Sequence, residues 1–379
     1  MAREIFVEGE EARTWSREAK WEVLGPYLRR WGWEGFSYAT LQDGFEYLVV
    51  DGVGYLAYDT VRHPVLAPRD IRAVFCSPIC APEHAPMLVA RLLEHGGRAC
   101  LAPVSEEVAR ALRPLGFRCV SVGEEPLVPL QTYPLDGDWR DHDLVRRARN
   151  EMRRQGVVIR EVPDLSAVDR EALDRITRGW LSHKPIADRE IRAYARPPVH
   201  GAEPDVRTFV AWDASGEVAG FGCYDPLYRD GQVFGYSANI CRCDESRFSK
   251  LSVAMHMTAA RVFREEGKEV LNLCLAPFLG VHRAEFRDHR FTEWFFRLSD
   301  RYGSRIYNFG GLRDHRVRYK VPGVTKYFAS RSLFPPNEAF LAYLGARMVD
   351  GYLSMAKDLL LGIGEGMGRD LRRSFRRRR

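Results

Sequence analysis

The stretch TFVAWDASGEVAGFGCYDPLYRDGQVFGYSANI (residues 208–240) decides the fold class of this chain of 379 residues. It contains three β-prone segments, Thr208–Trp212, Val218–Tyr224 and Gln232–Ile240. The short turn sequences between them, DASG and RDG, predict two hairpins and therefore antiparallel strands. Downstream, the apolar spacing predicts a helix over Lys250–Glu266, and Glu269–Leu275 is typical of a further strand.

The first half of the chain shows the same order of elements. We expect four strands, a helix, a strand, a second helix and a closing strand, over residues 37–41, 47–50, 54–58, 71–76, 83–94, 99–102, 105–112 and 118–122. Hairpin strands followed by a helix and another strand are the central order of the GNAT acyltransferase fold, which both halves resemble. The predicted fold class is therefore α/β (α+β), with two tandem GNAT-like domains, each a mixed sheet flanked by helices.

The predicted elements divide the chain into four parts. Residues 1–34 are expected to form a helical lead-in, 35–135 the N-terminal GNAT-like domain, and 136–330 the C-terminal, catalytic GNAT-like domain. Residues 331–379 follow as an amphipathic helix, with apolar residues at spacings of three and four from Leu341 to Leu359, and a polybasic tail. Two alternatives stay open for residues 337–379: a helix packed on the second domain, or a peripheral contact with an anionic membrane surface.

The net charge of +6 matters less than the places where charge gathers. Arginines cluster in RRARNEMRR (residues 146–154) and RRSFRRRR (residues 372–379), which favours polyanionic partners such as nucleic acid or an anionic membrane. The eight cysteines form no CxxC pair and no set with metal-ligand spacing, so we expect reduced thiols, a cytoplasmic protein and no metal. The first residues show no secretion signal, and no window of 18 apolar residues predicts a membrane span.

The segment RIYNFGGLRDHRVRYKVPGVTKYFA (residues 305–329) is predicted as an aromatic strand that ends at Phe309–Leu312, followed by a dense cationic run. A glycine pair permits close approach of the backbone to a ligand, and arginines interleaved with aromatic rings suit a phosphate-rich partner. The candidates for binding substrate phosphates are Arg313, Arg316, Arg318, Lys320 and Lys326. The alternative is a solvated surface turn held by salt bridges.

Short motifs in a fixed order carry a resemblance over residues 35–329. They are SY (37–38), GYLAY (54–58), SP (77–78), LGF (115–117), GEE (123–125), RRARN (146–150), GWL (179–181), LNL (271–273), AP (276–277), GV (280–281) and FGGLR (309–313). On these motifs the chain resembles the catalytic C-terminal domain of lysyl-phosphatidylglycerol synthase, the multiple peptide resistance factor. The resemblance implies a tandem GNAT-like fold and transfer of an aminoacyl group from aminoacyl-tRNA to the hydroxyl of phosphatidylglycerol or a related lipid.

The sequence departs from that family's pattern in three places. It contains no membrane-embedded flippase half, YKVPG (319–323) stands where the family continues toward Phe-x-Pro-x-Trp, and LCL (273–275) replaces Leu-Gly-Met. Two alternatives therefore stay open. One is aminoacyl-tRNA-dependent transfer to a small-molecule acceptor, as in stand-alone relatives in natural-product pathways. The other is a non-catalytic tRNA-binding module on a GNAT-like scaffold.

The predicted donor site lies between the last hairpin strand and the following helix. Asp244 in this loop is the candidate for binding the donor's α-ammonium group or for acting as a base, or else it is an ordinary helix N-terminal charge. Tyr236, Asn239 and Asn272 are expected to line the same groove, whereas His256 is expected to be a core residue. The candidates for contacting the tRNA backbone, with a solvated helix face as the alternative, are Arg146, Arg147, Arg149, Arg153 and Arg154.

The same loop, CRCDESRFSKLS (residues 241–252), contains no glycine. Acetyl-CoA-dependent GNAT enzymes wrap the pyrophosphate with a glycine-rich backbone at this place, so the sequence argues against CoA. A Walker-type or GxGxxG motif is also missing. Because transfer from an ester to a hydroxyl is close to thermoneutral, we expect no cofactor. Aminoacyl-tRNA would be the co-substrate and, for a lipid acceptor, the location would be the inner face of the membrane.

Overall fold

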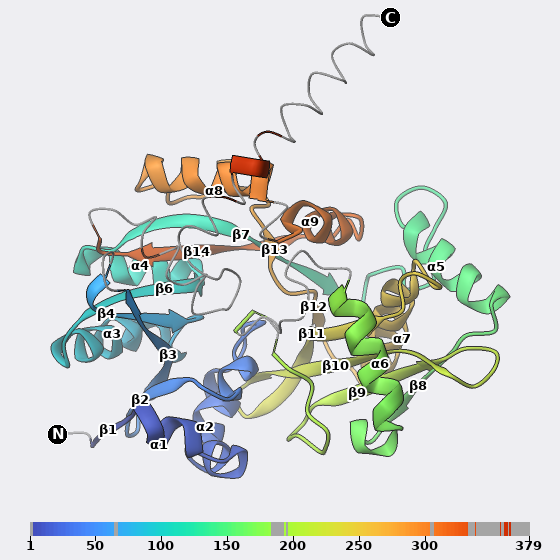
Figure 1. The fold of residues 1–379 in the computed structure, drawn as a ribbon, viewed down its shortest axis with the longest axis horizontal. Helices are drawn as coiled ribbons and strands as arrows, with labels where there is room; N and C mark the ends of the chain where they lie inside the picture. Colours follow the sequence, from blue (N-terminus) through green and yellow to red (C-terminus); the bar gives the residue numbers. More distant parts are fainter. Residues whose placement is uncertain are drawn as a thin grey trace, which may run out of the picture.

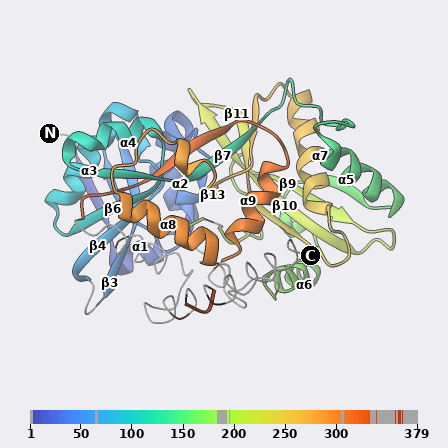
Figure 2. The same cartoon turned by 90° about the horizontal axis from the view of Figure 1, so that it is seen from above.

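The computed structural model describes residues 3–63, 67–182, 193–194, 196–303 and 307–332, together with residues 338, 357, 360–362 and 364. The described strands form one large mixed sheet, and helices cover both of its faces (Figures 1 and 2). The predicted α/β class is therefore confirmed, but the two expected sheets are continuous with each other. Among the described residues, no helix is long and apolar enough to cross a membrane.

The first half begins with antiparallel strands and continues with a parallel crossover. Its opening elements are β1 (Glu4–Val7), α1 (Gly9–Thr14), α2 (Arg17–Trp31), β2 (Glu46–Val50), β3 (Gly54–His63), β4 (Ala67–Phe75) and β5 (Ile79–Cys80). The helix α3 (Ala85–Glu94) then leads to β6 (Arg98–Val104), which lies parallel to β4. The helix α4 (Glu106–Leu112), which Ser105 caps, precedes the long strand β7 (Arg118–Pro129).

The second half repeats this plan, as the hairpin pattern predicts. Its first described elements are two α-helices and four antiparallel strands. They are, in chain order, α5 (Asp143–Arg154), β8 (Val158–Val162), α6 (Arg170–Ser182), β9 (Arg207–Trp212), β10 (Val218–Arg229) and β11 (Gln232–Cys243). The helix α7 (Leu251–Glu265) leads to β12 (Val270–Asn272), which lies parallel to β11 just as β6 lies parallel to β4. The last elements are β13 (Ala276–Pro277), α8 (Arg290–Tyr302), α9 (Phe309–Val317) and β14 (Gly323–Ser330).

The two halves exchange their closing strands. The end of β7 pairs with β12 of the second half, and β14 lies between β6 and β7 of the first half. The resulting strand order is β1-β2-β3-β4-β6-β14-β7-β12-β11-β10-β9-β8. The last strand of the predicted 136–330 domain thus completes the sheet of the predicted 35–135 domain, so the two halves share one sheet.

Side chains alternate between the two faces of the sheet and so build separate cores. In β9, Phe209 and Ala211 pack with residues of α5 and α7, whereas Val210 between them packs with residues of α6. In β2, Leu48 packs with α3 and α4, whereas Tyr47 packs with α2. This alternation follows from the two-residue period of a strand. It places α6 on the opposite face of the second half from α5 and α7.

Two local predictions are wrong. Residues Tyr38–Leu41, expected as part of a strand, form a 3-10 helix. Residues Phe309–Leu312, expected as the end of an aromatic strand, form the first turn of α9, with Asn308 as the capping residue. The amphipathic pattern from Leu341 to Leu359 and the polybasic tail lie outside the described residues, apart from single positions.

Candidate functional site

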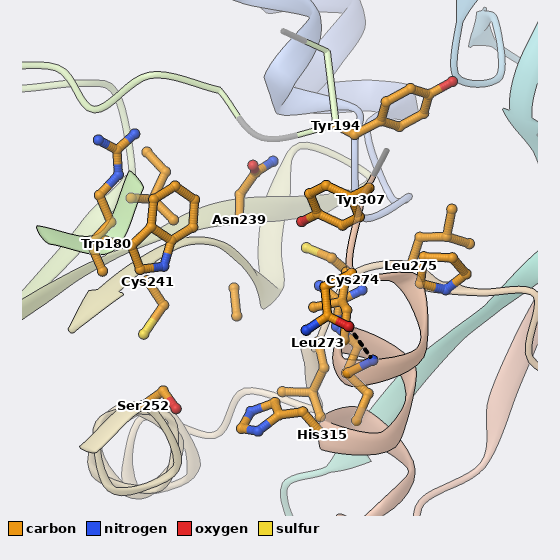
Figure 3. Close-up of a pocket in the computed structure, with 18 of the residues that line it drawn as sticks. Trp180, Tyr194, Asn239, Cys241, Ser252, Leu273, Cys274, Leu275, Tyr307 and His315 are labelled. Carbon is orange, nitrogen blue, oxygen red and sulfur yellow. Dashed lines mark hydrogen bonds between the residues drawn. The ribbon is translucent and has the colours of Figure 1, made fainter. Parts of the chain in front are cut away.

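A cavity of about 890 Å³ lies where the two halves meet. Five structural parts of the second half surround it: α6, the end of β11 with the following loop, the start of α7, the segment after β12, and α9. The inner wall is apolar and consists of Phe36, Ala102, Pro103 and Val122 from the first half together with Phe328 from β14. Figure 3 shows side chains from these elements pointing toward one space. A cavity of this size and mixed lining suits a ligand of the size of an aminoacyl nucleoside.

One face of α9 forms the cationic wall of this cavity. Leu312, His315 and Arg316 of α9 recur at helical spacing and line the cavity, and Tyr319, two residues after the end of the helix, lines it as well. The guanidinium group of Arg316 is half-buried and makes no hydrogen bond or ion pair with another described residue. Burial lowers the pKa of Arg316, but an arginine pKa starts so high that the group stays charged. An unpaired cation at this position can bind an anionic group of a ligand.

Two neutral histidines lie beside this arginine. His256 on α7 and His315 on α9 both line the cavity. Burial and the neighbouring positive groups lower the pKa of His256 to about 3 and that of His315 to about 4. The Nδ1 atom of His256 lies 3.0 Å from the Tyr224 hydroxyl, and Nε2 of His315 lies 3.5 Å from the Tyr319 hydroxyl. Both imidazoles are therefore neutral at pH 7, when each ring has one nitrogen that can accept a proton.

The loop after β11 contributes a carboxylate. Asp244 lines the cavity and is half-buried. Its Oδ1 atom accepts hydrogen bonds from the Ser246 hydroxyl at 2.5 Å and from the Arg247 backbone N–H at 3.3 Å, which fix the side chain at the start of the loop. Asn239 on β11 lines the cavity as well, as the sequence predicts. A fixed carboxylate here can bind an ammonium group.

Two predicted groove residues lie outside the cavity. Tyr236 is buried in the core, where its ring stacks on Phe263 with centroids 4.1 Å apart. Asn272 is also buried, and its Nδ2 atom donates to Glu125 at 2.7 Å. The expectation that these two side chains line the groove is therefore wrong in its geometry. They pack directly behind the wall, because neighbouring residues of a strand point to opposite faces.

The predicted phosphate-binding residues are divided by the fold. Arg316 and Arg318 line the cavity, whereas Arg313, Lys320 and Lys326 do not. Arg313 pairs with Asp300, and Lys320 pairs with Asp141 at 2.9 Å on the surface. Lys326 is buried, and its ammonium group lies 2.5 Å from Glu34 and 3.8 Å from Glu125. With two carboxylates around it, Lys326 has no room for a phosphate, so this part of the prediction is wrong.

The cationic helix α5 lies away from the cavity. Arg146 and Arg147 pair with Asp143 on the same helix, and Arg149 pairs with Asp136. A shallow groove of about 630 Å³ beside α5 is lined by Arg147, Asn150, Glu151, Arg153, Arg154 and Lys250. Lys250 precedes the first turn of α7, and Ser252 in that turn lines the main cavity. The groove and the cavity therefore lie on either side of one helix end.

The sequence interpretation missed several residues of the cavity wall. Trp180, Tyr194, Cys274, Tyr307 and His315 all line the cavity (Figure 3). The signal for His315 was present, because Leu312, His315, Arg316 and Tyr319 follow the spacing of one helical face. Among the described residues, no group of three or more histidine, cysteine or carboxylate side chains is arranged to hold a metal ion.

The sequence of this chain is similar to known proteins over most of its length. The family model described as "Phosphatidylglycerol lysyltransferase, C-terminal" matches residues 28–330. The phosphatidylglycerol lysyltransferase of Bacillus subtilis (strain 168) is 24% identical over 320 residues, which are 82% of this chain and 35% of that protein. An uncharacterized protein of Corynebacterium glutamicum is 23% identical over 266 residues, which are 68% of this chain and 32% of that protein. The chain thus spans about a third of the length of these curated relatives.

Solved structures share the fold. L-PGS from Bacillus licheniformis has a TM-score of 0.68 at 18% sequence identity, covering 86% of this chain and 96% of that one. The C-terminal domain of a putative lysylphosphatidylglycerol synthetase from Agrobacterium fabrum also has a TM-score of 0.68, at 20% identity, covering 89% of this chain and 100% of that one. At such identities the comparison establishes the fold alone.

Proposed function

The chain belongs to the phosphatidylglycerol lysyltransferase C-terminal family, and from this premise we propose that it transfers an aminoacyl group from aminoacyl-tRNA to the hydroxyl of phosphatidylglycerol or a related lipid. The observation that carries the proposal is the unpaired Arg316, which faces a cavity beside the two neutral histidines His256 and His315. This combination supplies a fixed positive charge and a proton acceptor without a metal or a nucleotide cofactor.

Transfer of the aminoacyl group requires a positive charge and a proton acceptor, which Arg316 and the neutral histidines would supply. The oxygen of the acceptor hydroxyl attacks the carbonyl carbon of the aminoacyl ester, and a new ester C–O bond forms as the C–O bond to the ribose breaks. The proton leaves the acceptor hydroxyl and reaches the departing ribose oxygen, for which neutral His315 is the proposed carrier. Arg316 would stabilise the oxyanion or bind the acceptor phosphate, and Asp244 would bind the α-ammonium group of the donor.

The inner wall of the cavity favours an acceptor with apolar chains. This wall consists of Phe36, Ala102, Pro103, Val122 and Phe328, and Phe296 of α8 adds a further apolar side chain to the cavity lining. Apolar surface of this kind would bind the first methylenes of an acyl chain and would contribute nothing to a small polar acceptor. The donor is a cytoplasmic RNA, so the proposal places the reaction at the inner face of the membrane, with residues 337–379 as the membrane contact.

The decisive experiment incubates the purified protein with radiolabelled aminoacyl-tRNA and a phospholipid extract, then separates lipids, RNA and water-soluble products. We expect label in the lipid fraction. Arg316→Ala should lower kcat/KM by roughly 10²–10³-fold, the effect of removing one stabilising group from an acyl-transfer site. Arg313→Ala, which removes an arginine paired with Asp300 outside the cavity, is the matched control and should retain most of the activity.

Three results would change the proposal. If the label stays on the tRNA with every acceptor, the protein is a tRNA-binding module and not a transferase. Label in a water-soluble product would replace the lipid with a small-molecule acceptor. Equal activity of Arg316→Ala and the unmodified protein would remove Arg316 from the site. Thermal unfolding of both variants shows whether either change acts through stability instead.

A further inference from the structure

The end of α6 presents a flat aromatic side chain to the cavity. Trp180 is half-buried and lines the cavity wall. In Figure 3 its indole ring lies on one side of the space, Tyr194 and Tyr307 lie on the other, and Asn239 lies between them. Trp180 belongs to none of the hydrophobic core clusters of the described residues, so its ring at the cavity wall is a candidate for contact with a ligand.

The indole ring is held in place by a buried arginine. The Cζ atom of Arg242 lies 5.1 Å from the ring centroid of Trp180, and Nη1 of Arg242 donates to the Thr177 hydroxyl at 3.2 Å. Thr177 and Trp180 are one turn apart on α6, and the Arg242 residue is only 3% exposed. The ring is thus oriented before any ligand arrives, which reduces the entropy lost on binding.

Gly179 keeps the space beside this ring open. A glycine inside a helix is less favourable than an alanine, and Gly179 lies inside α6 with an ordinary negative φ angle. Packing does not require it, because a Cβ atom built at this position would meet no atom within 4 Å among the described residues. Gly179 also lines the cavity. A larger residue here would project into the space next to Trp180.

Positive charge accompanies the aromatic ring on the same helix. Arg175 lines the cavity, and Arg178 is exposed one turn further along α6. An aromatic face combined with arginines is the usual device for binding unpaired nucleotides, since the ring stacks on a base and the cations neutralise phosphates. These arginines lie on the opposite face of the sheet from the α5 cluster.

We propose that Gly179 and Trp180 form a seat for a nucleobase, namely the terminal base of the donor RNA. The base stacks on the Trp180 ring and occupies the space beside Gly179, while Arg175 and Arg178 contact the preceding phosphates. The inference rests on the proposed function, because an aminoacyl-tRNA donor carries its ester on the terminal nucleoside. It goes beyond that function by placing the terminal base at α6, whereas the arginines of α5 are candidates for contacting the tRNA backbone.

The test measures binding of two probes by calorimetry. One is an aminoacyl-adenosine with a non-hydrolysable 3′-amide, and the other is the corresponding free amino-acid amide, which has no base. Trp180→Ala should weaken binding of the nucleoside probe by about 5- to 150-fold, as expected for one stacked base, and leave the amino-acid amide unchanged. Trp180→Phe should restore most of the affinity. Gly179→Leu should abolish binding of the nucleoside probe without lowering the unfolding temperature.

The outcomes separate this inference from the proposed function. If the unmodified protein transfers label from aminoacyl-tRNA but Trp180→Ala and Gly179→Leu bind the nucleoside probe normally, the seat is wrong and the function stands. If Trp180→Ala weakens both probes equally, the ring contacts the amino acid instead of the base, which also overturns the seat. If the unmodified protein neither binds the nucleoside probe nor transfers label, both the base-binding site at Trp180 and the proposed function are wrong.

Discussion

His256 shows how a buried side chain links the cavity to the pH dependence of stability. The His256 side chain is buried, its Nδ1 atom lies 3.0 Å from the Tyr224 hydroxyl, and the positive charge of Arg316 acts on it, together with that of His315 once His315 is protonated at low pH. Burial lowers its pKa to about 3, from about 6.5 in the unfolded chain. The unfolded state therefore binds the proton more strongly, and stability is complete above pH 6.5 and falls as the pH decreases toward 3.

We expect His256→Gln to remove part of this pH dependence. Between pH 7 and pH 5 the unmodified protein should lose about 2 kcal/mol of unfolding free energy through His256 alone, because each pH unit below 6.5 contributes about 1.4 kcal/mol. Urea unfolding at both pH values measures the loss, and the variant should lose that much less. A glutamine can still bond to Tyr224, so the comparison isolates the titration. Equal losses in the two proteins would show that folding does not lower the pKa of His256.

Two lysines show which residue properties the sequence could predict. Lys320 and Lys326 appear in one cationic run, and both were candidates for binding phosphates. Lys320 pairs with Asp141 on the surface, whereas Lys326 is buried between Glu34 and Glu125. Charge can be inferred from residue type, but Glu34 lies 292 positions away from Lys326 in the chain. A contact of that range depends on the whole topology, so local sequence could not reveal it.

The helix α9 shows how an element can be misassigned and still carry the site. Aromatic residues followed by Gly310 and Gly311 resemble the end of a strand. In the structure Asn308 caps a helix, and its Oδ1 atom accepts from the Gly311 N–H at 3.0 Å. A Cβ atom at Gly311 would lie 2.4 Å from the Asn308 side chain, which explains this glycine. The cationic run is plain in the sequence, but the helical period of 3.6 residues was needed to recognise which of its residues share one face.

The helix α5 offers a test of the RNA interface at the element scale. The side chains of Arg153 and Arg154 border the shallow groove and make no hydrogen bond or ion pair with other described residues. Arg149 on the same helix pairs with Asp136. If α5 contacts the tRNA backbone, each of Arg153→Ala and Arg154→Ala should reduce the slope of log K against log salt by about 1. Filter binding of tRNA across a salt series measures this slope.

The matched control for this measurement is Arg149→Ala, whose slope should stay close to that of the unmodified protein. Transfer at saturating tRNA should change little in all three variants, because α5 lies outside the cavity. Unchanged slopes for Arg153→Ala and Arg154→Ala would show that α5 is only a solvated helix face.

At the scale of the whole molecule, the repeat was predictable and the strand exchange was not. Turn sequences and periodicity are local signals, so they predicted hairpins followed by a helix and a strand in each half. The pairing of β14 with β6 joins residues more than 200 positions apart. Neither strand contains a local signal for its partner, since any strand edge offers the same backbone donors and acceptors. The cavity lies at this exchange, because Val122 of β7 and Phe328 of β14 both line it.

The exchanged strands predict that the two halves unfold together. A fragment of residues 1–137 would lack β14, so β6 and β7 would lose the strand that lies between them, and the edges of both would be exposed. We therefore expect one calorimetric transition for the whole chain, with coincident urea transitions by fluorescence and circular dichroism. The separate fragments 1–137 and 138–379 should show no cooperative unfolding alone and should recover it when refolded together. Two separate transitions, or a fragment that unfolds cooperatively alone, would mean that each half forms its own core without the exchange.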